Sequence, residues 1–476
     1  MKLSIFRIVG AVLLTFVVVW ALVLGWWQAN DHEPGRQDLV LYLLAIPVAL
    51  NVGFWLLYGF IGNLTSPESH PGEKTPLATG DDPLGGLGAP PEDTGKTHAI
   101  GLVDAFVAIP NASDGDGLLS AVKKGIRPGP SDEFTDADGY PVVVAKVDGV
   151  DVSVMATRLI DAPASVSEWV AAHPLALRWL TLLDGVLGKA HDAIESLLTT
   201  MAAMEAVRLR VVWLVPVNAN SALLGDLGVW LRRAYWKDLS EGELSVSIHA
   251  ATGEAEALKR LDDNVLRIGG DGGGNEVTVL LAASSSIDAS VIEERLAGNR
   301  LFSSGSPDRQ IPGEGSVALI LASRSVVERA GLADVIWLGR PCCGAVGKAP
   351  GSGGRITGTV LRQLVTSVLE NASADPVAVK TAVLDTDHRP SYIAEAMEGL
   401  GEAFGHLDPI QDCLSLSAVV GSPGLIGGLL TVACARARVL QDQTPVLCIC
   451  NQDEFFRAAL LASPMSAPLP MNQPST

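Results

Sequence analysis

The hydrophobic positions of this chain fall into two different patterns, and the first is confined to the N-terminus. Residues 8–27 contain no charged side chain, and residues 39–62 form a second apolar run that is interrupted only by Pro47 and Asn51. Each run is long enough to cross a hydrocarbon core of about 30 Å. We therefore predict a two-helix transmembrane hairpin over residues 1–62.

The charges that flank these runs predict the orientation of the hairpin. Lys2 and Arg7 precede the first run, whereas the loop 28–37 has two acidic residues against one arginine. Basic residues stay on the cytoplasmic side of a membrane. The N-terminus and everything after the hairpin are then cytoplasmic. A cleaved signal peptide is the alternative for 8–27, but the run is long, lacks a small-x-small cleavage signal and is followed at once by a second span.

The second pattern begins after a linker. Residues 63–97 contain six Pro and six Gly, which is typical of a flexible tether. From residue 98 onward, short apolar runs alternate with helical periodicity, with one long helical region at 169–209 that we expect to break near Gly185 and Gly188. The runs predicted as strands are 100–109, 209–216, 275–281, 317–322, 333–338, 377–385, 413–420 and 445–450. Such alternation predicts an α/β layered fold with a mostly parallel sheet.

Composition and charge exclude one class of partner. The 476 residues carry a formal net charge of −19, and an acidic chain lacks the basic surface that nucleic-acid binding needs. The six cysteines all lie in the last third of the chain, without the spacing of a zinc site, so we expect buried reduced thiols and a cytoplasmic domain.

Two segments carry a resemblance to a known family. Residues 301–321 read LFSSGSPDRQIPGEGSVALIL, and residues 248–258 read IHAATGEAEAL. They resemble, in the same order and at a similar separation, two motifs of the β-ketoacyl synthases of the thiolase superfamily. The resemblance covers roughly 98–462. It implies a duplicated thiolase-like fold with two five-stranded mixed sheets in α-β-α-β-α layers, one half at 98–325 and the other at 326–476.

The same resemblance implies that the catalytic residues are missing. The position of the nucleophilic cysteine is occupied by Ala250, and a shift of one residue gives Ala251 or His249, neither of which can carry an acyl thioester. The first catalytic histidine corresponds to the neighbourhood of His388, without the glycines and threonines of the family motif. The second corresponds to Ser422. No condensing activity, cofactor or metal is expected.

Two other chemistries compete with simpler interpretations. Ser422 and His388 could form a minimal acyl-transfer pair, but a serine before a proline also suits a helix N-cap. Asp385 and Asp387 could bind a metal, but the end of a strand favours a solvated loop. We prefer the structural interpretation in both cases. The Gly313-Glu314-Gly315 turn is also expected to be structural.

Three functions fit these observations. The first is a membrane-anchored, inactive thiolase-like adaptor in the bacterial inner membrane; similar degenerate proteins occur beside type VI secretion genes, which would make secretion cargo the partner. The second is an acyl-transfer or hydrolytic enzyme that acts on acyl-CoA or acyl-carrier protein through a rewired site. The third is an inactive subunit that pairs with an active ketosynthase. The fold also implies a homodimer through the strand at 244–248.

Overall fold

The computed structural model describes Trp20, Val23 and residues 95–466, except 137, 202–206, 217–219, 240–241, 271–272, 304 and 349–356. The part of the chain from residue 90 onward forms one compact unit. The predicted hairpin over 1–62, apart from Trp20 and Val23, and the linker as far as residue 94 lie outside the described residues.

Two sets of five strands share one pattern of connections. The first set is β1 (Ala99–Ala108), β4 (Arg208–Val215), β5 (Leu244–Ala250), β6 (Glu276–Ser285) and β7 (Glu314–Ala322). The second set is β8 (Ile336–Gly339), β10 (Thr381–Leu384), β11 (Cys413–Ser415), β12 (Val446–Cys450) and β13 (Phe456–Pro464). The apolar runs predicted from the sequence account for eight of these strands, since buried strands read as continuous apolar segments. No run was predicted at β13, β5 was expected only from the family resemblance, and the run 413–420 ends in a short helix, Ser417–Val420.

The strand order shows an internal duplication. The sheet runs β11-β10-β12-β13-β8-β1-β7-β6-β4-β5, which is symmetric about the β8–β1 pair. In each half the second strand pairs in parallel with the third and the fourth, and the fifth pairs antiparallel with the fourth and the first. The duplicated α/β architecture expected from the sequence is therefore present. The sheet is mixed, however, and not mostly parallel as the strand–helix alternation predicted, because β1, β7, β8 and β13 pair antiparallel with their neighbours.

The two expected five-stranded sheets are not separate, however. Backbone pairing of β1 with β8, from Ala99↔Gly339 to Leu102↔Ile336, joins them. With β9 (Cys342–Ala345) paired to β13, the result is one 11-stranded sheet. A hairpin of β2 (Gly129–Thr135) and β3 (Pro141–Val144) forms a separate two-stranded sheet.

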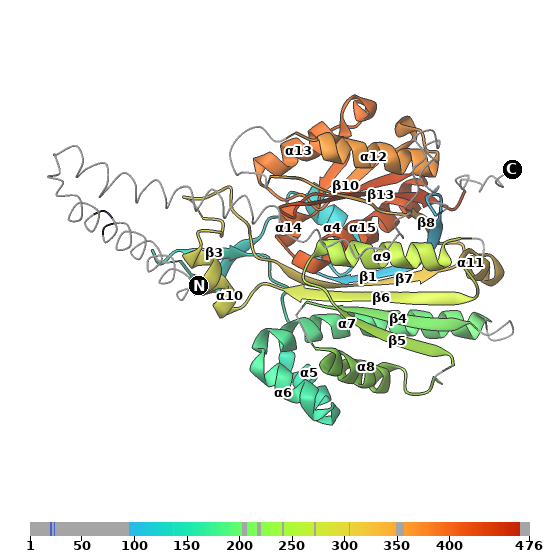
Figure 1. Ribbon diagram of the computed structural model, residues 1–476, viewed down its shortest axis with the longest axis horizontal. Helices are drawn as coiled ribbons and strands as arrows, with labels where there is room; N and C mark the ends of the chain where they lie inside the picture. Colours follow the sequence, from blue (N-terminus) through green and yellow to red (C-terminus); the bar gives the residue numbers. More distant parts are fainter. Residues whose placement is uncertain are drawn as a thin grey trace. The chain divides into compact units, whose positions relative to one another are not determined.

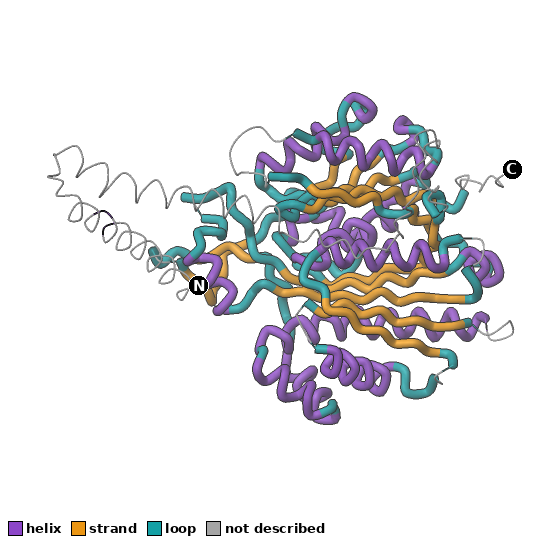
Figure 2. The backbone as a smooth tube through the Cα atoms, viewed as in Figure 1, coloured by secondary structure: helices purple, strands orange, loops and turns teal. Residues whose placement is uncertain are grey.

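Helices lie in three layers around this sheet (Figure 1). Those against the outer face of the first half are α5 (Val152–Arg158), α6 (Ala164–Ala172), α7 (Pro174–Met201) and α8 (Ser221–Tyr235). Those against the outer face of the second half are α12 (Thr359–Ala372) and α13 (Pro390–Leu400). Those between the halves are α4 (Gly115–Lys123), α9 (Glu254–Ile268) and α15 (Gly427–Asp442), as the tube view in Figure 2 also shows.

Four short helices complete the connections: α10 (Ala289–Ala297), α11 (Arg324–Ala330), α14 (Ser417–Val420) and the 3₁₀ turn η5 (Gly424–Ile426). Three further 3₁₀ turns are η2 (Leu159–Asp161), η3 (Pro376–Ala378) and η4 (Glu402–Phe404). The predicted break in the long helical region is at His173, where α6 and α7 meet at 115°, and not at Gly185 or Gly188, which lie inside a continuous α7. A proline at the first position of α7 explains this boundary.

The middle layer is the most deeply buried part of the described domain. Leu258 and Leu261 of α9 and Leu429 and Cys434 of α15 are at most 1% exposed and pack between both halves of the sheet. The segment Gly424–Asp442 has the length and hydropathy of a membrane span, but 67% of it is buried inside the domain. We therefore interpret it as a core helix.

The Gly313-Glu314-Gly315 segment is the start of β7 and not a turn, and it ties several elements together. Glu314 is fully buried, accepts hydrogen bonds from Val147 N and Ser285 Oγ at 2.8 Å each, and pairs with Arg178. A Cβ on Gly313 would stand 2.1 Å from the carbonyl oxygen of Val420, so only glycine allows this close approach.

The Glu314 contacts predict a large effect of a small substitution. Glu314→Gln should lower the free energy of unfolding of the full-length chain by about 3 kcal/mol, because Arg178 loses its buried carboxylate partner. Glu133→Gln is the matched control, since Glu133 pairs with Lys146 at the surface and should change stability by less than about 1 kcal/mol. Denaturant titration measures both. Equal effects would show that Glu314 is not a structural centre.

Candidate functional site

The position assigned to the nucleophile lies at a strand-to-helix elbow. Ala250 is the last residue of β5, and α9 begins four residues later at Glu254. Ala251 N donates to the carbonyl of Val215 at 2.9 Å, and Gly253 N donates to the Glu256 carboxylate at 2.9 Å. The elbow is thus held by backbone contacts that do not depend on the side chain at position 250.

The other two assigned positions lie in loops and are not paired. Nε2 of His388 contacts the carbonyl oxygen of Pro307 at 3.1 Å, and its ring packs edge-on against Phe302. Ser422 N donates to the carbonyl of Ile311 at 2.8 Å. Ser422 is also not an N-cap, because Pro423 holds the cap position of η5. No hydrogen bond between Ser422 and His388 occurs in the described structure.

The expectation of a solvated loop after β10 is wrong. Asp385 and Asp387 are 1% and 2% exposed. Oδ1 of Asp385 accepts hydrogen bonds from Asn451 N at 2.7 Å and Gln452 N at 3.2 Å. Asp387 pairs with Arg389 at 2.8 Å. The loop turns inward because β12, the parallel neighbour of β10, ends beside it and presents its backbone N–H groups to Asp385.

Three buried side chains meet at this point. Glu254 opens α9, Asp385 follows β10, and Cys450 ends β12; one ligand-type atom of each lies within 4.8 Å of the others. All three are buried. Gly427, the first residue of α15, faces the same spot, since a Cβ there would lie 3.1 Å from Glu254 Oε1 and 3.8 Å from Asp385 Oδ2. We call Glu254, Asp385 and Cys450 the buried acidic cluster.

Burial dominates the electrostatics of this cluster. Loss of solvent raises the pKa of Glu254 well above its usual value, and the neighbouring Asp385 and Asp453 charges raise it further. Burial also raises the pKa of Asp385, to about 6, although contacts from Glu254, the Asn451 and Gln452 backbone N–H groups and Arg457 oppose this. Both carboxyls of the pair are therefore easier to protonate than exposed ones. Burial likewise raises the pKa of the Cys450 thiol.

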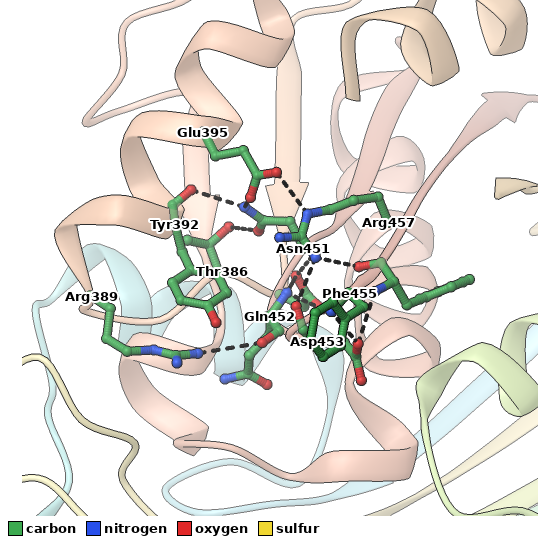
Figure 3. A network of polar contacts seen from close by, with 11 residues as sticks. Thr386, Arg389, Tyr392, Glu395, Asn451, Gln452, Asp453, Phe455 and Arg457 are labelled. Atoms are coloured by element: carbon green, nitrogen blue, oxygen red, sulfur yellow. Dashed lines mark hydrogen bonds and ion pairs between the residues drawn. The ribbon is translucent and has the colours of Figure 1, made fainter. Parts of the chain in front are cut away.

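A second polar network adjoins the cluster in the second half of the fold (Figure 3). Arg457 and Glu395 form a fully buried ion pair at 2.8 Å. Asn451 Nδ2 donates to the carbonyl of Tyr392 at 2.9 Å, and the Arg389 guanidinium lies 3.7 Å from the centre of the Tyr392 ring. These contacts fix the loop that follows β12, and so fix the N–H groups that hold Asp385.

Comparison with known proteins identifies the fold of this chain. No family model matches the chain, and no curated protein matches it. Many solved structures do. A type II polyketide synthase acyl-carrier protein in complex with its ketosynthase bound to the hexaketide matches with a TM-score of 0.54 and 10% identity, over 78% of this chain and 100% of that one.

Two further structures agree. The oxazolomycin ketosynthase domain of Streptomyces albus JA3453 has a TM-score of 0.53 and 14% identity, over 80% of this chain and 76% of that one. The ishigamide ketosynthase/chain length factor has a TM-score of 0.53 and 9% identity, over 78% and 100%. The chain has the thiolase-like fold of the ketosynthases. Identities this low show the fold alone.

Sequence reasoning did not find Glu254 as a member of the site. An acidic residue in the first turn of a helix is ordinary, because it complements the helix dipole. Asp385 was noted, but its burial was not, since a strand followed by Asp-Thr-Asp reads as a polar loop. Only the meeting of α9 with the ends of β10 and β12 reveals the cluster, and no local pattern encodes that meeting.

The raised pKa values predict how stability depends on pH. A carboxyl whose pKa is higher in the folded state stabilises the fold below its unfolded pKa, and this stability is lost as the pH rises through the folded value. The free energy of unfolding of the wild-type chain, measured with a chelator present, should therefore fall between pH 5 and pH 8. Glu254→Gln should flatten this slope and raise stability at pH 8 by about 2 kcal/mol.

The control for this prediction is Glu256→Gln, two residues further along the same helix at an exposed position. It should leave the slope between pH 5 and pH 8 as in the wild type. Denaturant titration at several pH values measures all three proteins. A Glu254→Gln slope equal to that of the wild type would show that the two carboxyls do not share a proton.

Proposed function

We propose that this chain is a catalytically inactive thiolase-like protein that is anchored in the bacterial inner membrane and acts as a binding or adaptor module. The observation that carries the proposal is Ala250, at the elbow where the family resemblance assigns the nucleophilic cysteine. A methyl side chain can neither attack a thioester nor hold an acyl group. The buried acidic cluster, which lies at the start of the helix that follows this elbow, contains no solvent-exposed nucleophile.

We infer the candidate partner from the predicted membrane location of the chain and from its structural neighbours. The two apolar runs at 8–27 and 39–62 would hold the domain at the cytoplasmic face, which membrane fractionation of the full-length chain tests. One structural neighbour is described as an acyl-carrier protein in complex with its ketosynthase, which favours a protein as the ligand of this fold. Together with the resemblance to proteins found beside type VI secretion genes, this makes secretion cargo the first candidate partner.

The absence of covalent chemistry is directly testable. The full-length chain, incubated with acyl-CoA and with an acylated acyl-carrier protein, should keep its intact mass, because position 250 has no nucleophile. A competent ketosynthase in the same assay is the positive control and should gain the mass of the acyl group. A stable adduct that maps to one residue would contradict the proposal. Loss of that adduct in Ser422→Ala would instead support the rewired acyl-transfer enzyme.

A homodimer through β5 is part of the proposal. In the described structure β5 pairs with β4 only, which leaves its other edge free to pair with a second copy. Ser245 on that strand is exposed, and Val246 and Ile248 are half-buried. An edge of this kind is a template for extending the sheet across two chains. A pairing with an active ketosynthase through the same edge is the third function considered above.

Positive charges introduced on the edge strand β5 should prevent dimerisation. Ser245→Lys together with Ser247→Lys places like charges opposite one another in a two-fold pairing, and should convert a dimer at micromolar concentration into a monomer. Ala297→Lys, exposed at the end of α10, is the control and should remain dimeric. Light scattering of the purified full-length chain measures the mass. A monomeric wild type would refute the homodimer and leave the heterodimer as the pairing to test.

A further inference from the structure

The buried acidic cluster has the composition of a metal site that links the two halves of the fold. Glu254 comes from the first half, and Asp385 and Cys450 come from the second. We propose that these three residues bind one divalent cation of the zinc class, with two carboxylate oxygens and one thiolate as ligands. Oxygen and sulfur donors together favour zinc or a similar borderline cation over magnesium or calcium, which prefer oxygen alone. The proposal is independent of the adaptor role.

The first argument is an acceptor without a donor. Oε1 of Glu254 is buried and has no hydrogen-bond partner, and the residue as a whole is 5% exposed. Such an atom costs free energy unless a proton, a water or a cation satisfies it. A cation between Oε1 of Glu254 and the carboxylate of Asp385 would remove this cost in free energy.

The second argument is how closely the start of α15 approaches the Glu254 carboxylate. The chain has glycine at both positions that face Glu254 Oε1: a Cβ on Gly427 would lie 3.1 Å from this atom, and a Cβ on Gly428 would lie 2.8 Å from it. Glycine weakens a helix relative to alanine by about 1 kcal/mol. Two adjacent glycines at the start of α15 therefore have a steric reason, because they let the Glu254 carboxylate approach the helix backbone at the point where it converges with Asp385.

The third argument is charge. Glu254 and Asp385 bring two carboxylates within 4.8 Å of one another, whereas the buried Arg457 guanidinium is already paired with Glu395 at 2.8 Å. The starts of α9 and α15 point positive dipole ends toward the cluster, which opposes a cation. Binding then depends on the Cys450 thiolate, which the cation forms by displacing the thiol proton. Affinity should rise with pH for this reason.

The test uses the full-length protein, stripped with a chelator and then titrated with Zn²⁺ and separately with Co²⁺. We expect one Zn²⁺ per chain that survives gel filtration, and a near-ultraviolet thiolate-to-cobalt charge-transfer band. Cys450→Ser and Glu254→Gln should each weaken binding at least 10-fold, and Cys450→Ser should abolish the band. Cys448→Ser is the matched control, since Cys448 is equally buried on β12 but lies outside the cluster, and it should bind as the wild type does.

Gly427→Ala provides a variant that leaves every ligand in place. Its methyl group would stand 3.1 Å from Glu254 Oε1 and should shift this ligand, so it should weaken Zn²⁺ binding although alanine favours the helix. X-ray absorption of the Zn²⁺-loaded wild type, which needs no variant to fold, should show one sulfur ligand among oxygens. Absence of stoichiometric Zn²⁺, absence of sulfur from its ligands, or equal loss in Cys450→Ser and Cys448→Ser would overturn the proposal in favour of a shared proton alone.

Discussion

The burial of α9 and α15 between the two halves of the sheet is the constraint on which the rest of this structure depends. The faces of both helices that meet the sheet or one another are apolar, as Leu261 and Leu429 are, whereas the outer face of α9 carries exposed residues such as Lys259. Their N-terminal ends, however, expose backbone N–H groups that need polar partners. Glu254 opens α9 at this place, and Asp385, which accepts hydrogen bonds from Asn451 N and Gln452 N, lies beside it.

The contacts that hold the backbone around the site do not depend on reactive side chains. The elbow at Ala250 is held by backbone hydrogen bonds, and the start of β7 is held by the close approach of Gly313 to Val420. Neither contact uses a reactive side chain. Loss of a nucleophile or a histidine therefore leaves the backbone in place, whereas loss of Gly313 or of the Glu314 carboxylate would not.

The sequence predicts the parts of the structure that depend on local pattern. Continuous apolar runs locate β1, β4, β6, β7 and β12, and the strand–helix alternation predicts the layered α/β class. The joining of both halves through β1 and β8 is not encoded in either strand, because edge pairing depends on how the halves meet. The same holds for the site. Residues more than a hundred positions apart form it, and a first-turn glutamate such as Glu254 looks no different from one that faces solvent.

The centre of the fold contains two kinds of buried polar groups, a hydrogen-bonded network and an acidic cluster, and the two have different consequences. The network around Asn451 uses its backbone N–H and its side-chain amide as donors to Asp385, Tyr392 and Glu395, and such networks specify one arrangement of the chain at little net gain in stability. The acidic cluster differs, because it has more acceptors than donors. A proton on Glu254 removes the excess charge but leaves an acceptor open, whereas a cation satisfies both carboxylates and the thiol together. The number of hydrogen-bond donors that face the acidic cluster, rather than its number of charges, therefore decides whether it holds a proton or a cation.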